Sequence, residues 1–224
     1  PCNTNCLITM HHAKNIPHVL YKCEHIFAGK NSNLDVLIER GIEYAKAGYY
    51  LEKEGFVLYM PERVEKYKRM YVKMINNIPY AVHLHREVAW HGIKILDKKG
   101  IFARKNEVNS IITIPSAEDS LLIHTAHILF ENFKIRERET EIISSCLAAK
   151  PDWNYINWQL RKNGWKKGFY DLLQIFKRNE NPRLADLVQN YLRKLAHSPR
   201  GSFYLLKKAL RSKARNLSLE RKGL

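Results

Sequence analysis

The first half of the chain is predicted to form a small β-sheet, because it contains short runs in which apolar residues alternate with polar ones. The predicted strands are 19–27, 34–38, 56–60, 67–75 and 79–88. Asn76 and Asn77 separate the last two runs, so we expect a hairpin there, since asparagine tolerates the backbone conformation of a tight turn. The segment 92–102 has no clear period and is expected to be irregular, with Leu96 and Phe102 buried.

One helix interrupts the predicted strands. Apolar residues recur at helical spacing from 40 to 54, and Gly55 is expected to end this helix. The residues expected near its buried face are Ile42, Ala45, Tyr49 and Leu51.

The second half of the chain is predicted to be helical. Ser116 is expected to be a helix N-cap, and Glu118 and Asp119 place negative charge in the first turn, where the helix dipole favours it. A second helix is expected to begin at Asp152 and to end at Gly164. Further helices are predicted at 165–178, 183–196 and 201–213. A series of aromatic residues at helix-like spacing is expected in the core: Trp153, Trp158, Trp165, Phe169 and Tyr170.

These elements predict an α+β fold, in which a small mixed β-sheet with flanking helices is followed by a helical domain. The predicted domains are residues 1–110 and 111–224, with the boundary near 105–115. The chain has 224 residues, which is enough for a substantial buried core. Its hydrophobic content of 45% argues against disorder.

The formal net charge of +16 indicates a polyanionic partner, such as RNA, DNA, nucleotide phosphates or an acidic protein. General solubility is the alternative explanation. The basic residues near the C-terminus include Lys207, Lys208, Arg211 and Arg215. Lys207, Arg211 and Arg215 are spaced to form a stripe on one helix face, which would follow a phosphate backbone or remain solvated. No apolar run approaches the length of a membrane span, so we expect a cytoplasmic protein without a membrane partner.

Cysteine and histidine residues gather near the N-terminus. Their spacing matches no standard zinc motif, so a zinc site and a set of reduced thiols both remain open. The residues concerned are Cys2, Cys6, His11, His12, Cys23 and His25. His124 and His127, three apart on a predicted helix, are expected to lie in an interface between sheet and helices.

Two predicted strands carry candidate chemistry. Asn33 and Asp35 are two residues apart, so their side chains leave the same face of a strand. His83, His85 and Glu87 likewise share one face of a later strand. We interpret this row as the wall of an active site beside Asp35, with an exposed strand face as the alternative.

The order of these motifs resembles uncharacterised nucleotidyltransferase-like proteins of the polymerase-beta superfamily. A strand with a lysine (LYKCEHIF) comes first, then a strand with an acid (NSNLDVLIE) and a helix that ends in Gly-Phe (LEKEGF). A strand with a Leu-His pair (HLHREVAW) and a helix reading IPSAEDSLLIHTAH follow. The resemblance covers about residues 19–178. It implies metal-dependent transfer of a nucleoside monophosphate from a nucleoside triphosphate to an acceptor hydroxyl.

Carried over by position, the family's second metal-binding acid corresponds to Asp35 and its first acid to Asn33. Its third acid corresponds to His83 and its histidine to His85. The resemblance therefore implies Mg²⁺ or Mn²⁺ on Asp35, together with Glu87 or His83. The expected nucleotide-binding residues are Lys22, Lys30, Ser32 and Asn33. The Gly-Ser pair that holds phosphates in the family is not recognisable here.

The replaced acids leave two functions open. In-line phosphoryl transfer with two metal ions requires several anionic oxygens, and Asn33 and His83 do not supply them. The chain is therefore predicted to be either a nucleotidyltransferase or a catalytically inactive module of the same fold that binds RNA or DNA through its basic surface.

Overall fold

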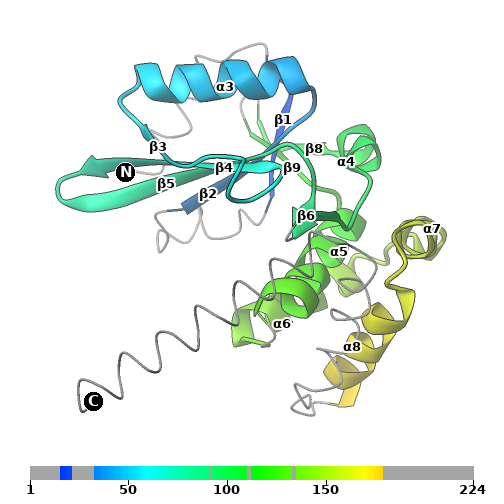
Figure 1. Ribbon diagram of the computed structural model, residues 1–224. Helices are drawn as coiled ribbons and strands as arrows, with labels where there is room; N and C mark the ends of the chain where they lie inside the picture. The colour runs from blue at the N-terminus through cyan, green and yellow to red at the C-terminus, as the bar shows by residue number, and fades with distance from the viewer. Residues whose placement is uncertain (1–15, 22–32, 91, 110–111, 133–134, 179–224) are drawn as a thin grey trace, which may run out of the picture.

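A five-stranded sheet with the strand order β1–β2–β5–β4–β3 forms the centre of the protein (Figure 1). The structure is a computed structural model, and it describes residues 16–21, 33–90, 92–109, 112–132 and 135–178. The strands are β1 (His18–Leu20), β2 (Asn33–Ile38), β3 (Val57–Met60), β4 (Lys68–Ile75) and β5 (Ile78–His85). β2 and β5 run parallel, and the other neighbours are antiparallel. The predicted mixed sheet is confirmed.

The predicted hairpin joins β4 to β5. Asn76 and Asn77 occupy its turn with φ angles of 50° and 62°, a left-handed conformation that asparagine adopts more readily than most residues. All residues of β4 then pair with β5 in one continuous register, from Lys68 opposite His85 to Ile75 opposite Ile78.

Helix α3 (Gly41–Lys53) covers one face of the sheet (Figure 1). Of the four residues predicted on this face, Leu51 is buried, but Ala45 is exposed and Ile42 and Tyr49 are 68% and 54% exposed, so their prediction is wrong. The buried stripe instead contains Tyr44, Ala47, Gly48 and Leu51, which follow the i, i+3, i+4, i+7 pattern. Gly48 belongs to this stripe for a steric reason, because a Cβ at that position would lie 2.3 Å from the Tyr71 hydroxyl oxygen.

The remaining elements follow β5. Two short pairs are β6 (Ala89–Trp90) with β7 (Ile93–Lys94) and β8 (Asn106–Glu107) with β9 (Thr113–Ile114). The helices are α4 (Lys98–Arg104), α5 (Ala117–His127), α6 (Glu137–Ala148), α7 (Trp153–Asn163) and α8 (Lys166–Arg178), and a π-helical turn, η1 (Ile128–Asn132), extends α5. Neither α4 nor α6 was expected from the sequence.

The predicted helix signals at the start of α5 and at both ends of α7 are confirmed. Ser116 Oγ accepts a hydrogen bond from the Asp119 amide at 3.2 Å, and Asp152 caps α7 through the amides of Asn154 and Tyr155. Gly164 ends α7 with φ of 72°, a left-handed conformation that favours glycine.

Two apolar clusters lie on opposite faces of the sheet. Leu34, Val36 and Ile38 of β2 point toward α3, where they pack with Tyr44 and Leu51. The other cluster joins residues of the opposite face, Val19, Tyr21 and Leu37, to the buried residues of α5, α6, α7 and α8. Part of the sheet therefore shares its core with the helices, and the division into domains at residue 110 stays a prediction.

The predicted aromatic core is only partly correct. Trp165 and Phe169 are buried, but Trp153 and Trp158 are 40% and 47% exposed, so their predicted burial is wrong. The predicted helices at 183–196 and 201–213 lie outside the described residues, as do residues 22–27 of the first predicted strand. In the part of the chain that the structure describes, no helix has the length and apolar character needed to cross a membrane.

Candidate metal centre

The parallel pairing of β2 with β5 brings one carboxylate and two imidazoles together. Asp35 lies opposite His83, and Leu37 lies opposite His85. Side chains alternate along a strand, so Asp35, His83 and His85 leave the sheet on the face opposite α3. This convergence of the aspartate strand and the histidine strand was expected from the sequence.

Both imidazoles contact the same carboxylate oxygen. His85 Nε2 lies 2.8 Å from Asp35 Oδ1, and His83 Nδ1 lies 3.3 Å from it. The His85 side chain is 5% exposed, whereas those of Asp35 and His83 are 14% and 16% exposed. His85 therefore anchors the cluster from within, while Asp35 and His83 remain accessible at its outer side.

Tyr21, the residue that follows β1, supports His85. Its ring packs edge-on against the His85 ring at a centroid distance of 4.7 Å, and its amide donates to the Asp35 carbonyl oxygen at 3.2 Å. Burial raises the pKa of Tyr21, and the negative charge of Asp35 raises it further, so the phenol stays protonated. Sequence reasoning missed this residue, although Val19 and Tyr21 alternate with Leu20 on the strand that borders Asp35.

The three side chains offer a donor set for a metal ion. One ligand atom from each, an oxygen of Asp35 and a nitrogen of each histidine, lies within 4.8 Å of the other two. Within the described residues, this is the one such group of three or more histidine, cysteine and acidic side chains. Two imidazoles and one carboxylate suit a first-row transition ion better than Mg²⁺, which prefers oxygen ligands.

Glu87 does not join the cluster. β5 ends at His85, so the alternation that would have placed Glu87 beside His83 stops before it. The Glu87 carboxylate instead accepts a hydrogen bond from Lys94 Nζ at 2.8 Å. The structure therefore does not bring Glu87 into the cluster of Asp35, His83 and His85, contrary to the prediction from the sequence.

The expected nucleotide-binding residues are only partly described. Asn33 begins β2, is exposed, and lies two residues before Asp35 on the same strand face. Lys22, Lys30 and Ser32 lie outside the described residues, as do the basic residues Lys207, Lys208, Arg211 and Arg215 and the N-terminal set Cys2, Cys6, His11, His12, Cys23 and His25.

Lys68 is a candidate that sequence reasoning missed. It lies directly opposite His85 in the antiparallel β4–β5 pair, so the two side chains share a sheet face. Its ammonium lies 3.5 Å from the Glu65 carboxylate, and its side chain is largely buried. The signal was the hairpin register, which could be counted from the Asn76–Asn77 turn and pairs position 68 with position 85.

The other two candidate histidines, His124 and His127, lie in and near helix packing contacts and not in the cluster. His124 is buried in α5, and His127 Nε2 lies 3.1 Å from Glu131 Oε2. Trp90 donates its indole N–H to the same Glu131 oxygen. These contacts tie α5 and η1 to β6, in agreement with the interface role expected for His127, whereas the same role for His124 stays a prediction.

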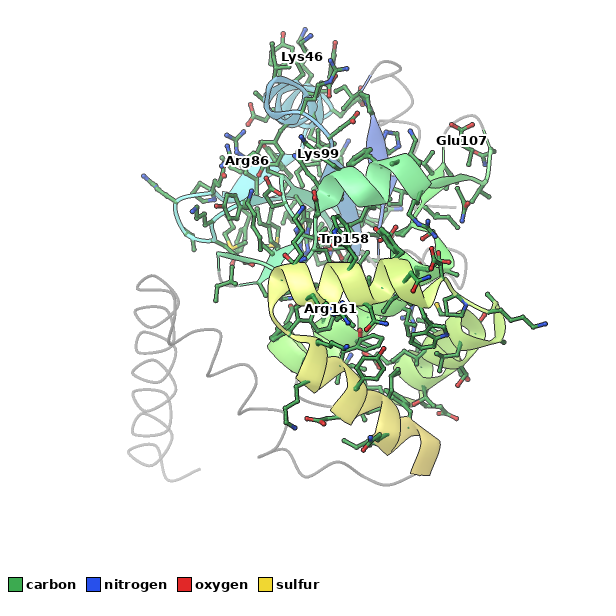
Figure 2. All side chains as sticks on the ribbon, turned by 90° about the vertical axis from the view of Figure 1, so that its right-hand side faces the viewer. Lys46, Arg86, Lys99, Glu107, Trp158 and Arg161 are labelled. Carbon is green, nitrogen blue, oxygen red and sulfur yellow. The ribbon has the colours of Figure 1, made fainter. Side chains whose placement is uncertain are left out.

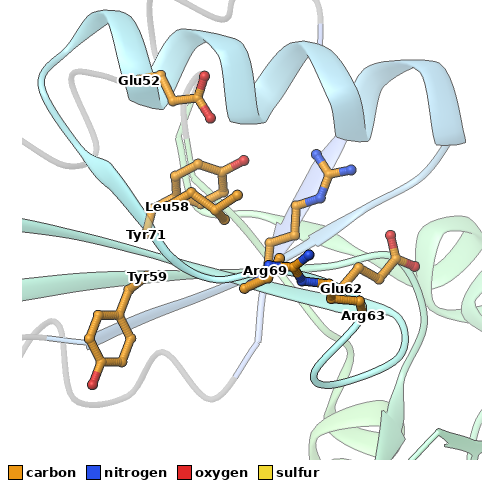
Figure 3. Close-up of a pocket in the computed structure, with 8 residues that line it drawn as sticks. Glu52, Leu58, Tyr59, Glu62, Arg63, Arg69 and Tyr71 are labelled. Atoms are coloured by element: carbon orange, nitrogen blue, oxygen red, sulfur yellow. The ribbon is translucent and has the colours of Figure 1, made fainter.

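A separate pocket of about 720 Å³ lies between α3 and the β3–β4 edge (Figure 3). Its lining includes Arg63, Arg69 and Tyr71. Tyr71 packs in the cluster on the α3 face of the sheet, whereas Asp35 leaves the opposite face. The pocket therefore lies on the other face of the sheet from the Asp35–His83–His85 cluster.

Comparisons of the chain with protein-family models, with curated proteins and with solved structures found no match.

Proposed function

We propose that the protein is a metal-dependent nucleotidyltransferase that transfers a nucleoside monophosphate from a nucleoside triphosphate to an acceptor hydroxyl. The observation that carries the proposal is the cluster of Asp35, His83 and His85 on adjacent parallel strands. The resemblance in the sequence pointed to these strands, and it assigned a metal-binding acid to the position of Asp35.

The donors fit one metal ion and not a pair. Asp35 supplies the single carboxylate of the cluster, so two divalent ions would keep most of their charge unbalanced. We therefore propose one ion, with Mn²⁺ favoured over Mg²⁺ because Mn²⁺ binds nitrogen ligands more strongly. When bound, such an ion would offset the negative charge of the nucleotide phosphates.

The histidines hold the carboxylate in place. In the metal-free cluster, the ring nitrogens that face Asp35 donate protons to its oxygen. If these nitrogens were to bind a metal, they would have to present lone pairs, and the proton of each neutral ring would reside on its other nitrogen. Tyr21 keeps the His85 ring in position through this change, because the Tyr21–His85 contact is made by ring faces and edges.

Two further side chains of the same sheet face suit a nucleotide. Lys68 supplies a cation next to His85, and a lysine ammonium binds phosphate as a point charge. Asn33 supplies an exposed amide two residues before Asp35, where it can donate to a phosphate or sugar oxygen.

A non-catalytic nucleic-acid-binding role is the second candidate. It is favoured by the fact that both imidazoles already contact the one carboxylate of the cluster, which leaves that charge partly compensated without a metal.

Titration with each nucleoside triphosphate in the presence of Mn²⁺ or Mg²⁺ tests the proposal. We expect metal-dependent binding and transfer in the wild type and loss of both in Asp35→Asn, which keeps the shape of the side chain and removes its charge. Glu87→Gln is the matched control. The Glu87 carboxylate is held by Lys94 outside the cluster, so this substitution should leave metal-dependent binding and transfer unchanged. Absence of metal-dependent nucleotide binding in the wild type would rule out the enzyme.

A further inference from the structure

The outward face of α4 and α7 carries an exposed indole among cations. Figure 2 shows Lys99 of α4 and Trp158 and Arg161 of α7 on one side of the molecule. Trp158 is 47% exposed, and Lys162 Nζ lies 4.7 Å from the centre of its ring. We call these four residues, Lys99, Trp158, Arg161 and Lys162, the α4–α7 face.

The two helices form one rigid support for this face. Gly100 lets them approach closely, since a Cβ there would lie 2.7 Å from the Tyr155 hydroxyl oxygen. The Asp97 amide donates to Gln159 Oε1 at 3.1 Å, and the Arg104 guanidinium lies 4.3 Å from the centre of the Tyr155 ring. The side chains of the face are therefore presented by packed helices.

The charge of this region is strongly one-sided. Residues 94–105 and 152–167 contain nine lysines and arginines against two aspartates. Asp97 pairs with Lys162, whereas no carboxylate of a described residue forms an ion pair with Lys99 or Arg161. The face therefore offers the positive charges of Lys99 and Arg161, neither of them in an ion pair with a described carboxylate, beside a large aromatic surface.

We propose that the α4–α7 face binds single-stranded nucleic acid, with a base stacked on Trp158 and phosphates on Lys99 and Arg161. Positive charge follows the backbone of a nucleic acid, and an exposed aromatic ring stacks on unpaired bases. A duplex keeps its bases stacked inside, so it would use the cations of the face but not the indole. Charge complementarity and the exposed indole together therefore select a single strand. This proposal does not depend on the metal centre.

Two substitutions separate the stacking contribution from the charge contribution. Stacking is sequence-tolerant and largely independent of salt, so Trp158→Ala should weaken binding roughly tenfold and leave the salt dependence unchanged. Trp158→Phe should restore most of the affinity because phenylalanine also stacks. Arg161→Ala should instead lower the slope of log affinity against log salt by about 0.7, the value for one phosphate contact on a single strand.

The measurement is fluorescence anisotropy of labelled oligouridylate and oligothymidylate with the full chain over a series of salt concentrations. Lys46→Ala is the control, since Lys46 is an exposed lysine of α3, outside the α4–α7 face (Figure 2). It should change neither the affinity nor the slope. Asp35→Asn should also bind normally, which separates failure of this proposal from failure of the proposed enzyme.

Three results would overturn the proposal. The first is absence of oligonucleotide binding by the wild type. The second is wild-type affinity in both Trp158→Ala and Arg161→Ala, together with loss of binding when the C-terminal basic residues are replaced. Those residues, Lys207, Lys208, Arg211 and Arg215, would then carry the binding. The third is an equal loss of duplex and single-strand binding in Trp158→Ala, because the indole would then not contact unpaired bases.

Discussion

Replacing Asp119 by asparagine should change how the stability of the protein depends on pH. The Asp119 carboxylate is buried between α5 and α7, where it accepts hydrogen bonds from the Tyr155 hydroxyl at 2.7 Å and from Ser116 at 3.1 Å. Burial raises its pKa from 3.8 to about 6, because the hydrogen bonds only partly replace the lost water.

The sign of the effect follows from proton binding. Between pH 3.8 and about 6 the folded protein keeps the Asp119 proton and the unfolded chain has released it. The free energy of unfolding therefore falls as the pH rises through this window, and the full cost is reached above pH 6. One unit of pKa corresponds to about 1.4 kcal/mol, so the cost is about 3 kcal/mol.

Urea denaturation of the wild type and Asp119→Asn at several pH values measures this cost. Asparagine has no proton to lose, so the variant should gain about 2 kcal/mol relative to the wild type between about pH 4 and about pH 7. Glu118→Gln is a control of opposite sign. Burial opposes ionisation of Glu118, but hydrogen bonds from the Asp152 amide and Arg104 outweigh it and lower the pKa to about 2. A stability difference between Asp119→Asn and the wild type that does not vary with pH would refute the reasoning.

The fold yields two further predictions. Gly48→Ala should destabilise the protein by about 1–3 kcal/mol in thermal or urea unfolding, because the new Cβ would overlap the buried Tyr71 hydroxyl. Gly41→Ala should not destabilise it, because the space around Gly41 is open. Equal stability of the two variants would contradict this account of the α3 interface. Asn77→Ala should lower the free energy of unfolding by about 1 kcal/mol, because the φ of 62° at this position is left-handed. Asn77→Gly should lower it less, because glycine adopts this conformation readily. A larger loss in the glycine variant would contradict the turn assignment.

The sheet and the starts of α5 and α7 could be predicted because their signals are local. Strand alternation, the Asn76–Asn77 turn and the N-caps at Ser116 and Asp152 each depend on a few neighbouring residues. The buried face of α3 could not be chosen in the same way. Its stripe includes Gly48, which has no apolar side chain and lies against the Tyr71 hydroxyl of β4.

The candidate site likewise contains residues that could be predicted from the sequence and residues that could not. Asp35, His83 and His85 were predicted together from the alternation of side chains along two strands and from the order of the motifs, and the parallel pairing of β2 with β5 brings them into contact. Glu87 was placed with them on the assumption that β5 continued, and the end of the strand at His85 depends on contacts that the local pattern does not record. The exposure of Trp158 is similarly a property of how α7 packs, since a tryptophan at helical spacing is typical of a core.

The central claim is that Asp35, His83 and His85 form one centre for a single transition-metal ion, and Co²⁺ titration tests it most directly. Visible absorption of the full chain should saturate at one Co²⁺ per chain, because the cluster holds one ion. The intensity and position of the absorption bands should indicate nitrogen and oxygen ligands. Mn²⁺ should compete for the site more effectively than Mg²⁺. Asp35→Asn and His85→Ala should each abolish the spectrum, and Glu87→Gln should retain it. Two results would contradict the account. One is the absence of a cobalt spectrum in the wild type, and the other is a wild-type spectrum in both Asp35→Asn and His85→Ala.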